Sequence, residues 1–184
     1  MNALKNHFLV SVPHMNDTLF GKSVVYICDH NKEGAMGLII NKSIDHRELK
    51  GIIKIQDLHS DQLENIKITI HFGGPVLIEK MIVLHTNTLK TKNAVVITNE
   101  ISISSEKDII KNISKNINMK YKLFLGHAGW GAGQLEREIE NGDWLLQSFN
   151  NELLFDIPSE KIWEQAIKSL GIDINDISNI GGMA

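Results

Sequence analysis

GHAGWGAGQLERE, residues 126–138, is the stretch that decides the fold of this chain. The apolar and aromatic run at residues 121–125 predicts a strand, the four glycines after it predict a loop, and the following residues predict an amphipathic helix. Because glycine has no side chain, the backbone rather than side-chain bulk sets the shape of such a loop. We therefore expect Trp130 to be buried in the space that the glycines leave. We also expect at least one of Gly129, Gly131 and Gly133 to have a positive φ.

Short apolar runs bounded by polar or glycine-containing segments predict strands elsewhere in the chain. These runs span residues 7–12, 23–29, 36–41, 66–72 and 80–85, and residues 95–104 resemble a further pair interrupted at Asn99. Several runs, such as residues 24–28, are apolar on both faces, which is typical of central strands that are covered on each side.

Helical periodicity and helix-end signals occur between these strands. The predicted helices span residues 45–55, 105–116, 134–141 and 159–170. The second begins with a Ser-x-x-acid cap at Ser105 and Asp108, and the last follows Pro158 and ends at Gly171. Strands that are partly adjacent and partly separated by helices predict an α+β or mixed α/β fold rather than a regular βαβ repeat.

The composition is that of an ordinary globular protein, with 42% hydrophobic and 22% charged residues. A chain of 184 residues predicts a single domain, residues 1–184, that needs no metal or disulfide for its stability. Cys28 is the only cysteine, which fits a reducing compartment, and the apolar run at residues 8–12 is too short for a signal peptide. No stretch approaches the length of a membrane span, so we expect a cytoplasmic protein without a membrane partner.

The glycine-rich stretch has the context of an anion site but not its chemistry. Glycines at positions 129, 131 and 133 lack the spacing of a dinucleotide motif, and no Gly-Lys-Ser/Thr follows them. Glu136, Glu138 and Glu140 crowd the predicted helix, so a bound phosphate would meet negative charge there. Packing of the loop around Trp130 is the favoured interpretation, and we expect no cofactor.

The eight histidines do not stand in metal-binding spacings. Four of them lie near predicted strand ends and could converge, namely His30, His71, His85 and His127. Cys28 and His30 are two residues apart on one strand, so they should share a face but stand roughly 7 Å apart, too far for a nucleophile pair. We therefore expect neither a metal site nor catalytic residues of this kind, and expect Cys28 to be a small core residue.

A basic strip is the one feature that suggests nucleic acid. Lysines at positions 107, 111 and 115 recur on one helical face, and Lys120 and Lys122 follow them. A solvated face is the commoner origin of such a strip. Since the net charge is −3 and no helix-turn-helix or zinc finger is present, we expect any DNA binding to be weak and non-specific.

The chain resembles the AlgH/YqgE family of bacterial proteins, whose typical element reads roughly GW-x-GQLE-x-E. That element matches Gly129-Trp130, Gly133-Gln134-Leu135-Glu136 and Glu138, and further matches run in order through nearly the whole chain. The family pattern usually has Asp-Pro at residues 17–18 and often Tyr at His127, so this chain departs from it twice. The resemblance implies a compact mixed α/β domain with its sheet curled into a pseudo-barrel. It implies no agreed catalytic residues, and part of the family is named for a regulatory effect on exopolysaccharide genes.

Polar groups at two strand-to-loop junctions form the candidate site. We expect a groove between residues 126–133 and the strand ends that carry His30 and Asn41. Its candidate binding residues are His30, Asn41, His127, Trp130, Gln134 and Glu138. The alternative is that these groups only hydrogen-bond the two segments together.

Three functions remain open on the sequence. The favoured one is a non-enzymatic protein that binds an unidentified protein or small molecule, with any effect on transcription indirect. The second is an enzyme whose cleft gathers His30, Asn41, His127 and Glu138, and the third is a direct DNA-binding regulator. Convergence of those polar side chains in one pocket would favour the enzyme.

Overall fold

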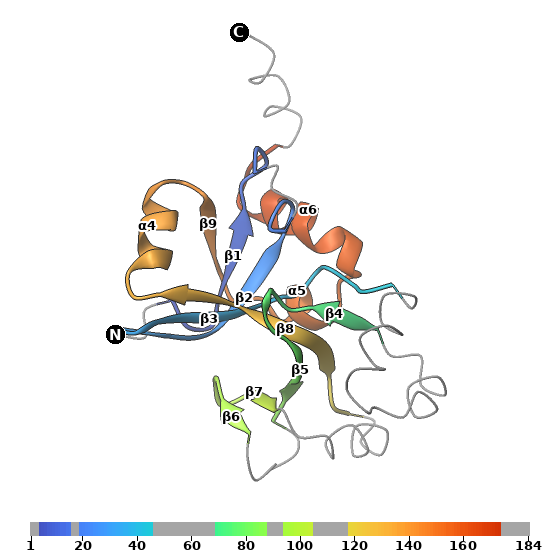
Figure 1. The fold of residues 1–184 in the computed structure, drawn as a ribbon. Helices are drawn as coiled ribbons and strands as arrows, with labels where there is room; N and C mark the ends of the chain where they lie inside the picture. Colours follow the sequence, from blue (N-terminus) through green and yellow to red (C-terminus); the bar gives the residue numbers. More distant parts are fainter. Residues whose placement is uncertain (1–3, 16–18, 46–68, 88–93, 105–117, 174–184) are drawn as a thin grey trace, which may run out of the picture.

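The computed structural model describes residues 4–15, 19–45, 69–87, 94–104 and 118–173. In these residues, strands form one strongly curled sheet that carries helices on both sides (Figure 1). The strands are β1 (His7–Ser11), β2 (Val24–Asn31), β3 (Gly34–Ile39), β4 (Ile70–Phe72), β5 (Val76–Thr86), β6 (Val95–Val96), β7 (Ile101–Ser104), β8 (Tyr121–Gly131) and β9 (Trp144–Ser148). The helices are α4 (Gln134–Glu140), α5 (Asn151–Phe155) and α6 (Ser159–Ser169). This is the expected α+β fold with a curled, mixed sheet.

The strand order is β6-β7-β5-β8-β3-β2-β1-β9, and neighbours on this path pair antiparallel. β4 lies off the path and pairs in parallel with the first half of β8. The sheet curls because β8 is shared: residues 121–125 pair with β4 and β5, whereas residues 128–131 pair with β3.

The prediction of a glycine loop after Leu125 is wrong, because β8 continues through Gly131. The glycines allow close contact between backbone segments within the sheet and do not form a turn. Gly126 has φ +69° and bends the strand, and a Cβ at this position would collide with the carbonyl oxygen of Gly74. The prediction of a positive φ is confirmed at Gly133, with φ +68°, which directly precedes α4.

The two faces of β2 pack into two hydrophobic cores. Val24, Tyr26 and Cys28 belong to a core that α6 covers, whereas Val25 and Ile27 belong to a second core that α4 covers. The second core contains Trp130, which is 7% exposed, so its predicted burial is confirmed. In Figure 1 the two helices accordingly lie apart, with α4 beside β9 and α6 across the sheet.

A β-bulge at Cys28 corrects the expectation that Cys28 and His30 share a face. The register shifts between Ile27 and Asp29, so Cys28 is an extra residue on β2. His30 then pairs with Ala35, which pairs with Trp130 and packs against the second core. Cys28 stays in the first core as the expected small core residue, with its thiol hydrogen bonding to the Tyr26 carbonyl.

The local predictions have mixed outcomes. α6 begins where expected and buries Ile162, Trp163, Ala166 and Ile167, and the predicted 95–104 pair forms as β6 and β7. β9 and α5 were not predicted. The predicted helices at residues 45–55 and 105–116 lie outside the described residues, apart from residue 45. None of the helices in the described part of the chain combines the length and apolar character needed to cross a membrane.

Candidate functional site

Glu138 on α4 is bonded by the two tryptophans of the second core. Its Oε2 accepts hydrogen bonds from Nε1 of Trp130 at 2.8 Å and from Nε1 of Trp144 at 2.9 Å. Its Oε1 accepts a third bond from Nε2 of Gln134 at 2.8 Å, and Gln134 Oε1 accepts from the Gly131 amide. The carboxylate therefore satisfies two buried indoles and joins α4 to β8 and β9. These contacts are structural, and none of them leaves Glu138 placed as a free acid or base.

His30 reaches the same helix through a different residue. His30 is 5% exposed, and its Nε2 lies 2.8 Å from Oε1 of Glu136, while its Nδ1 accepts from the Leu4 amide at 3.4 Å. A neutral imidazole with its proton on Nε2 satisfies both contacts. Backbone hydrogen bonding at Glu136 itself, followed by the bond from His30, lowers the pKa of the Glu136 carboxyl. His30 is thus hydrogen-bonded to α4, which agrees with the alternative that these polar groups only join segments of the fold.

Asn41 and His127 do not join this cluster. Asn41 Oδ1 accepts from the Val24 amide and its Nδ2 donates to the Lys22 carbonyl, so it secures the turn at the start of β2. Val24 is six residues from His30, which places Asn41 roughly 20 Å from it along an extended strand. His127 alternates with Ala128 and Trp130 on β8, so it faces away from the second core, and partial burial lowers its pKa. The six candidate residues therefore do not converge in one groove.

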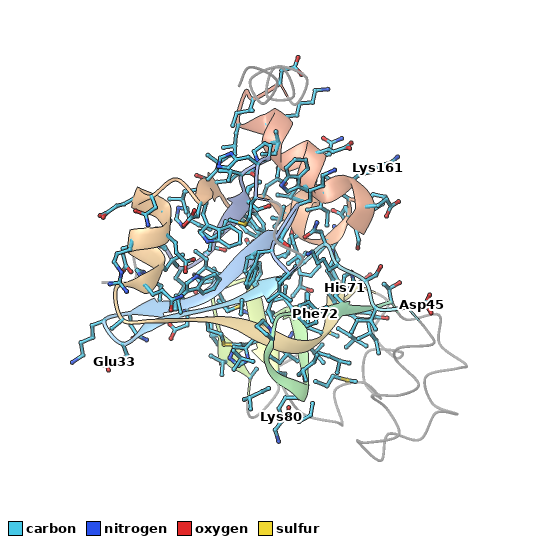
Figure 2. The ribbon with its side chains drawn as sticks, turned by 45° about the horizontal axis from the view of Figure 1, so that its top comes forward. Glu33, Asp45, His71, Phe72, Lys80 and Lys161 are labelled. Atoms are coloured by element: carbon cyan, nitrogen blue, oxygen red, sulfur yellow. The ribbon has the colours of Figure 1, made fainter. Side chains whose placement is uncertain are left out.

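A separate cavity of about 540 Å³ lies where the start of β8 meets β4 and the segment that joins α5 to α6. We call it the α6 cavity. It is lined by Ser43, Thr69, His71, Tyr121, Lys122, Phe155, Asp156, Ile157, Pro158, Ser159 and Glu160. Figure 2 shows His71 on β4, below α6 and on the opposite side of the view from α4. The cavity has a volume typical of small-molecule sites.

His71 and Ser159 form a hydrogen-bonded pair in this cavity. His71 is 4% exposed, its Nε2 lies 2.9 Å from the Ser159 Oγ, and its Nδ1 lies 3.3 Å from the Leu123 carbonyl oxygen. A carbonyl oxygen can only accept, so Nδ1 carries the proton and Nε2 accepts the bond from the Ser159 hydroxyl. Burial, and then the charge of Lys122, lower the pKa of His71 to about 4, so the ring is neutral at pH 7.

Lys122 is a buried cation without a carboxylate partner among the described residues. It is 8% exposed, and its Nζ donates to the carbonyl oxygen of Ile40 at 3.0 Å. Burial lowers the pKa of its ammonium from 10.5 to about 8. A buried charge is costly unless it is paired, so this ammonium favours an anion in the cavity.

The other charges lie at the rim of the cavity. Lys120 Nζ lies 2.7 Å from both carboxylate oxygens of Asp156, and this pair joins the residue before β8 to the end of α5. Glu160 is exposed in the first turn of α6. Lys120 is thus paired and Lys122 is buried, so neither is a free surface cation of the basic strip that the sequence suggested for nucleic acid. The three other lysines of that strip, at positions 107, 111 and 115, lie outside the described residues.

The α6 cavity was missed on the sequence because its residues come from distant segments. His71 and Ser159 are 88 positions apart and share no motif. Pro158 indicated the start of a helix in the sequence, but no motif there indicated a binding site. Among the described residues, no group of three or more His, Cys, Asp or Glu side chains could hold a metal ion. His30, His71 and His85 each bond to a different part of the fold.

Comparisons with known proteins match the chain over nearly its whole length. The AlgH-like family model matches residues 8–175. A UPF0301 protein from Shewanella loihica is 38% identical over all of both chains, and one from Marinomonas sp. is 40% identical over 96% of this chain and 94% of its own. The solution structure of the AlgH protein from Pseudomonas aeruginosa is similar, with a TM-score of 0.74, 34% identity, and coverage of 98% of this chain and 94% of that one. A crystal structure of a Corynebacterium diphtheriae protein, 21% identical with a TM-score of 0.70 over 90% of this chain and 86% of that one, shares the fold.

Proposed function

The chain belongs to the AlgH-like family, and from that premise we propose that it is a binding protein whose site is the α6 cavity. The ligand is a small molecule that carries one anionic group, either a carboxylate or a phosphate. The observation that carries this proposal is the buried Lys122 ammonium, which lines the cavity and has, among the described residues, only a backbone carbonyl as its hydrogen-bond partner.

Electrostatics support an anion at this position. An ammonium has three donors, and Ile40 accepts only one of them in the described contacts of Lys122. An anion in the cavity would take the remaining donors and offset the desolvation that lowers the pKa of this lysine. Asp156 at the rim is already neutralised by Lys120, so its repulsion of a ligand is small.

The walls of the cavity suit the rest of a small molecule. Phe155, Ile157 and Pro158 supply apolar surface, and Thr69 and Tyr121 supply hydroxyl groups. Small-molecule sites commonly combine an apolar lining with a few polar groups in this way. We infer that the protein acts in the cytoplasm and that any effect on gene expression follows from ligand or partner binding rather than from contact with DNA.

A titration of the full chain with sodium phosphate and, separately, with sodium acetate tests the proposal. We expect saturable NMR shifts of the Tyr121 and Ser159 backbone amides with at least one of the two anions. Lys122→Met should weaken that binding by about 10- to 100-fold, the loss of a charge-assisted hydrogen bond. Affinity should also fall as the pH rises through about 8, where the ammonium loses its proton.

Lys161→Gln is the matched control, because Lys161 lies on α6 but is exposed and points outward (Figure 2). This variant should bind like the natural chain. Two results would overturn the proposal. One is the absence of saturable shifts with either anion, and the other is equal binding by the Lys122→Met variant in a spectrum that shows it folded.

A further inference from the structure

We propose that Ser159 is a nucleophile that the α6 cavity activates toward small carboxylic esters or thioesters, with His71 as its base. The inference rests on the proposed function in that the same cavity must admit the substrate. It goes beyond binding, because it assigns a covalent step, acyl transfer, to these two residues.

The geometry is that of a serine–histidine dyad. The Ser159 Oγ lies 2.9 Å from Nε2 of His71, within the range that direct proton transfer needs. The Leu123 carbonyl, 3.3 Å from Nδ1, holds the ring in the tautomer whose Nε2 is free to accept a proton. A backbone carbonyl thus orients the base, as a carboxylate does in a catalytic triad. Ser159 is partly exposed, so an ester can reach it from the cavity.

Two further features of the cavity fit acyl transfer. Ser159 is the first residue of α6, an 11-residue helix whose N-cap residue, Pro158, provides no side-chain cap. The Pro158 carbonyl accepts from the Lys161 amide, whereas the two preceding amides, of Ser159 and Glu160, have no acceptor within the helix. Lys122 lines the same cavity as a cation. These donors can stabilise the negative charge that forms on a carbonyl oxygen when Ser159 attacks.

The reaction balances without an added oxidant or metal. Ser159 Oγ forms a bond to the acyl carbon while its proton passes to Nε2 of His71. The tetrahedral intermediate collapses with cleavage of the bond to the alcohol or thiol, which leaves with the proton from His71. Water then attacks the acyl-serine, again with His71 as base, and releases the carboxylic acid and the free serine. The product is itself a carboxylate, one of the two anions that the proposed function assigns to the cavity.

The experiment treats the full chain with p-nitrophenyl acetate and follows both p-nitrophenolate release and the intact mass. We expect release of p-nitrophenolate and an added acetyl group that peptide mapping places on Ser159. Ser159→Ala should abolish the adduct, and His71→Gln should slow acylation by roughly 100-fold or more, the usual contribution of a positioned base. Ser169→Ala is the control, because Ser169 lies at the far end of α6 and bonds to Ala166 and Gln147.

Labelling and anion binding together distinguish the Ser159–His71 dyad from the binding function. Acetylation of lysines alone, or equal labelling of the Ser159→Ala variant, would overturn the dyad. Phosphate or acetate binding by Ser159→Ala, together with an unreactive natural chain, would leave the binding function intact and refute acyl transfer. A Ser159 adduct that forms at an unchanged rate in Lys122→Met and without saturable anion binding would support the dyad and refute the anion site.

Discussion

The indole nitrogen of Trp130 donates a hydrogen bond to the Glu138 carboxylate at 2.8 Å, across the gap between β8 and α4. Both residues belong to the glycine-rich signature, and the same carboxylate oxygen accepts from Trp144 on β9. The two indoles meet edge to face, with ring centroids 6.3 Å apart. The signature is therefore a packing unit that joins one helix to two strands.

Removing the Trp130 side chain should destabilise the protein strongly. Trp130→Ala empties an aromatic site in the second core, and we expect the free energy of unfolding to fall by about 3–5 kcal/mol in a urea titration. Trp130→Phe keeps a ring but loses the indole donor, and should cost less than the alanine variant. Equal stability of the natural chain and Trp130→Ala would contradict the packing role.

Glu138→Gln should reduce stability without affecting the α6 cavity. A glutamine amide cannot accept from two indoles and Gln134 as a carboxylate does, so we expect a loss of about 1–3 kcal/mol. Glu140→Gln, at the exposed end of the same helix, is the control and should change little. Anion binding and acetylation should be unchanged in both variants. Loss of either activity in a stable Glu138→Gln protein would indicate that the functional site lies in the glycine-rich signature.

The bend at Gly126 should not tolerate a side chain. Gly126→Ala places a Cβ against the Gly74 carbonyl at a positive φ, so it combines backbone strain with a steric clash. Gly142→Ala is a matched control, since Gly142 has φ +81° but open space around a Cβ. We expect the free energy of unfolding to fall by about 1 kcal/mol in the control and by at least about 2 kcal/mol more in Gly126→Ala, as measured by thermal unfolding. Similar costs for both would show that only the backbone conformation matters there.

Stability should fall in mild acid because of His71. The folded pKa of about 4 lies below the ordinary value of 6.5, so between these values the unfolded state binds a proton that the folded state does not. The contribution is fully present above pH 6.5 and is lost as the pH falls to about 4, by roughly 3 kcal/mol. His71→Gln should flatten this part of the stability profile in urea titrations from pH 4 to pH 7. An unchanged profile would show that other groups cause the acid sensitivity.

Sequence-specific DNA binding is not expected. In a mobility-shift titration at physiological salt, the protein should show no preference among promoters, because the net charge is −3 and Lys122 is buried. Tight binding to one promoter that persists at that salt would contradict this. The changes Lys107→Gln, Lys111→Gln and Lys115→Gln, made together, would then show whether the lysine strip carries it.

The sequence by itself determined several of the local elements. Pro158 and Gly171 mark the ends of α6, short apolar runs mark β1 to β3, and the resemblance of the signature identified the family. The burial of Trp130 and a positive φ in the glycine segment also followed from side-chain size and from the lack of a Cβ. These features depend on neighbouring residues, which a sequence shows directly.

Tertiary structure decided which polar groups meet. One extra residue in β2, the bulge at Cys28, moved His30 to the other face and gave it Glu136 as a partner. The glycines of β8 suggested a loop, but pairing with β3 keeps this segment extended. Close backbone contacts with β3 and with Gly74 outweigh the tendency of glycine to form turns. The α6 cavity joins His71 to Ser159 across 88 residues. Burial lowers the pKa values of His71 and Lys122 there, and the charge of Lys122 lowers that of His71 further. Long-range register and desolvation set these relationships, and neither is written in the spacing of residues along the chain.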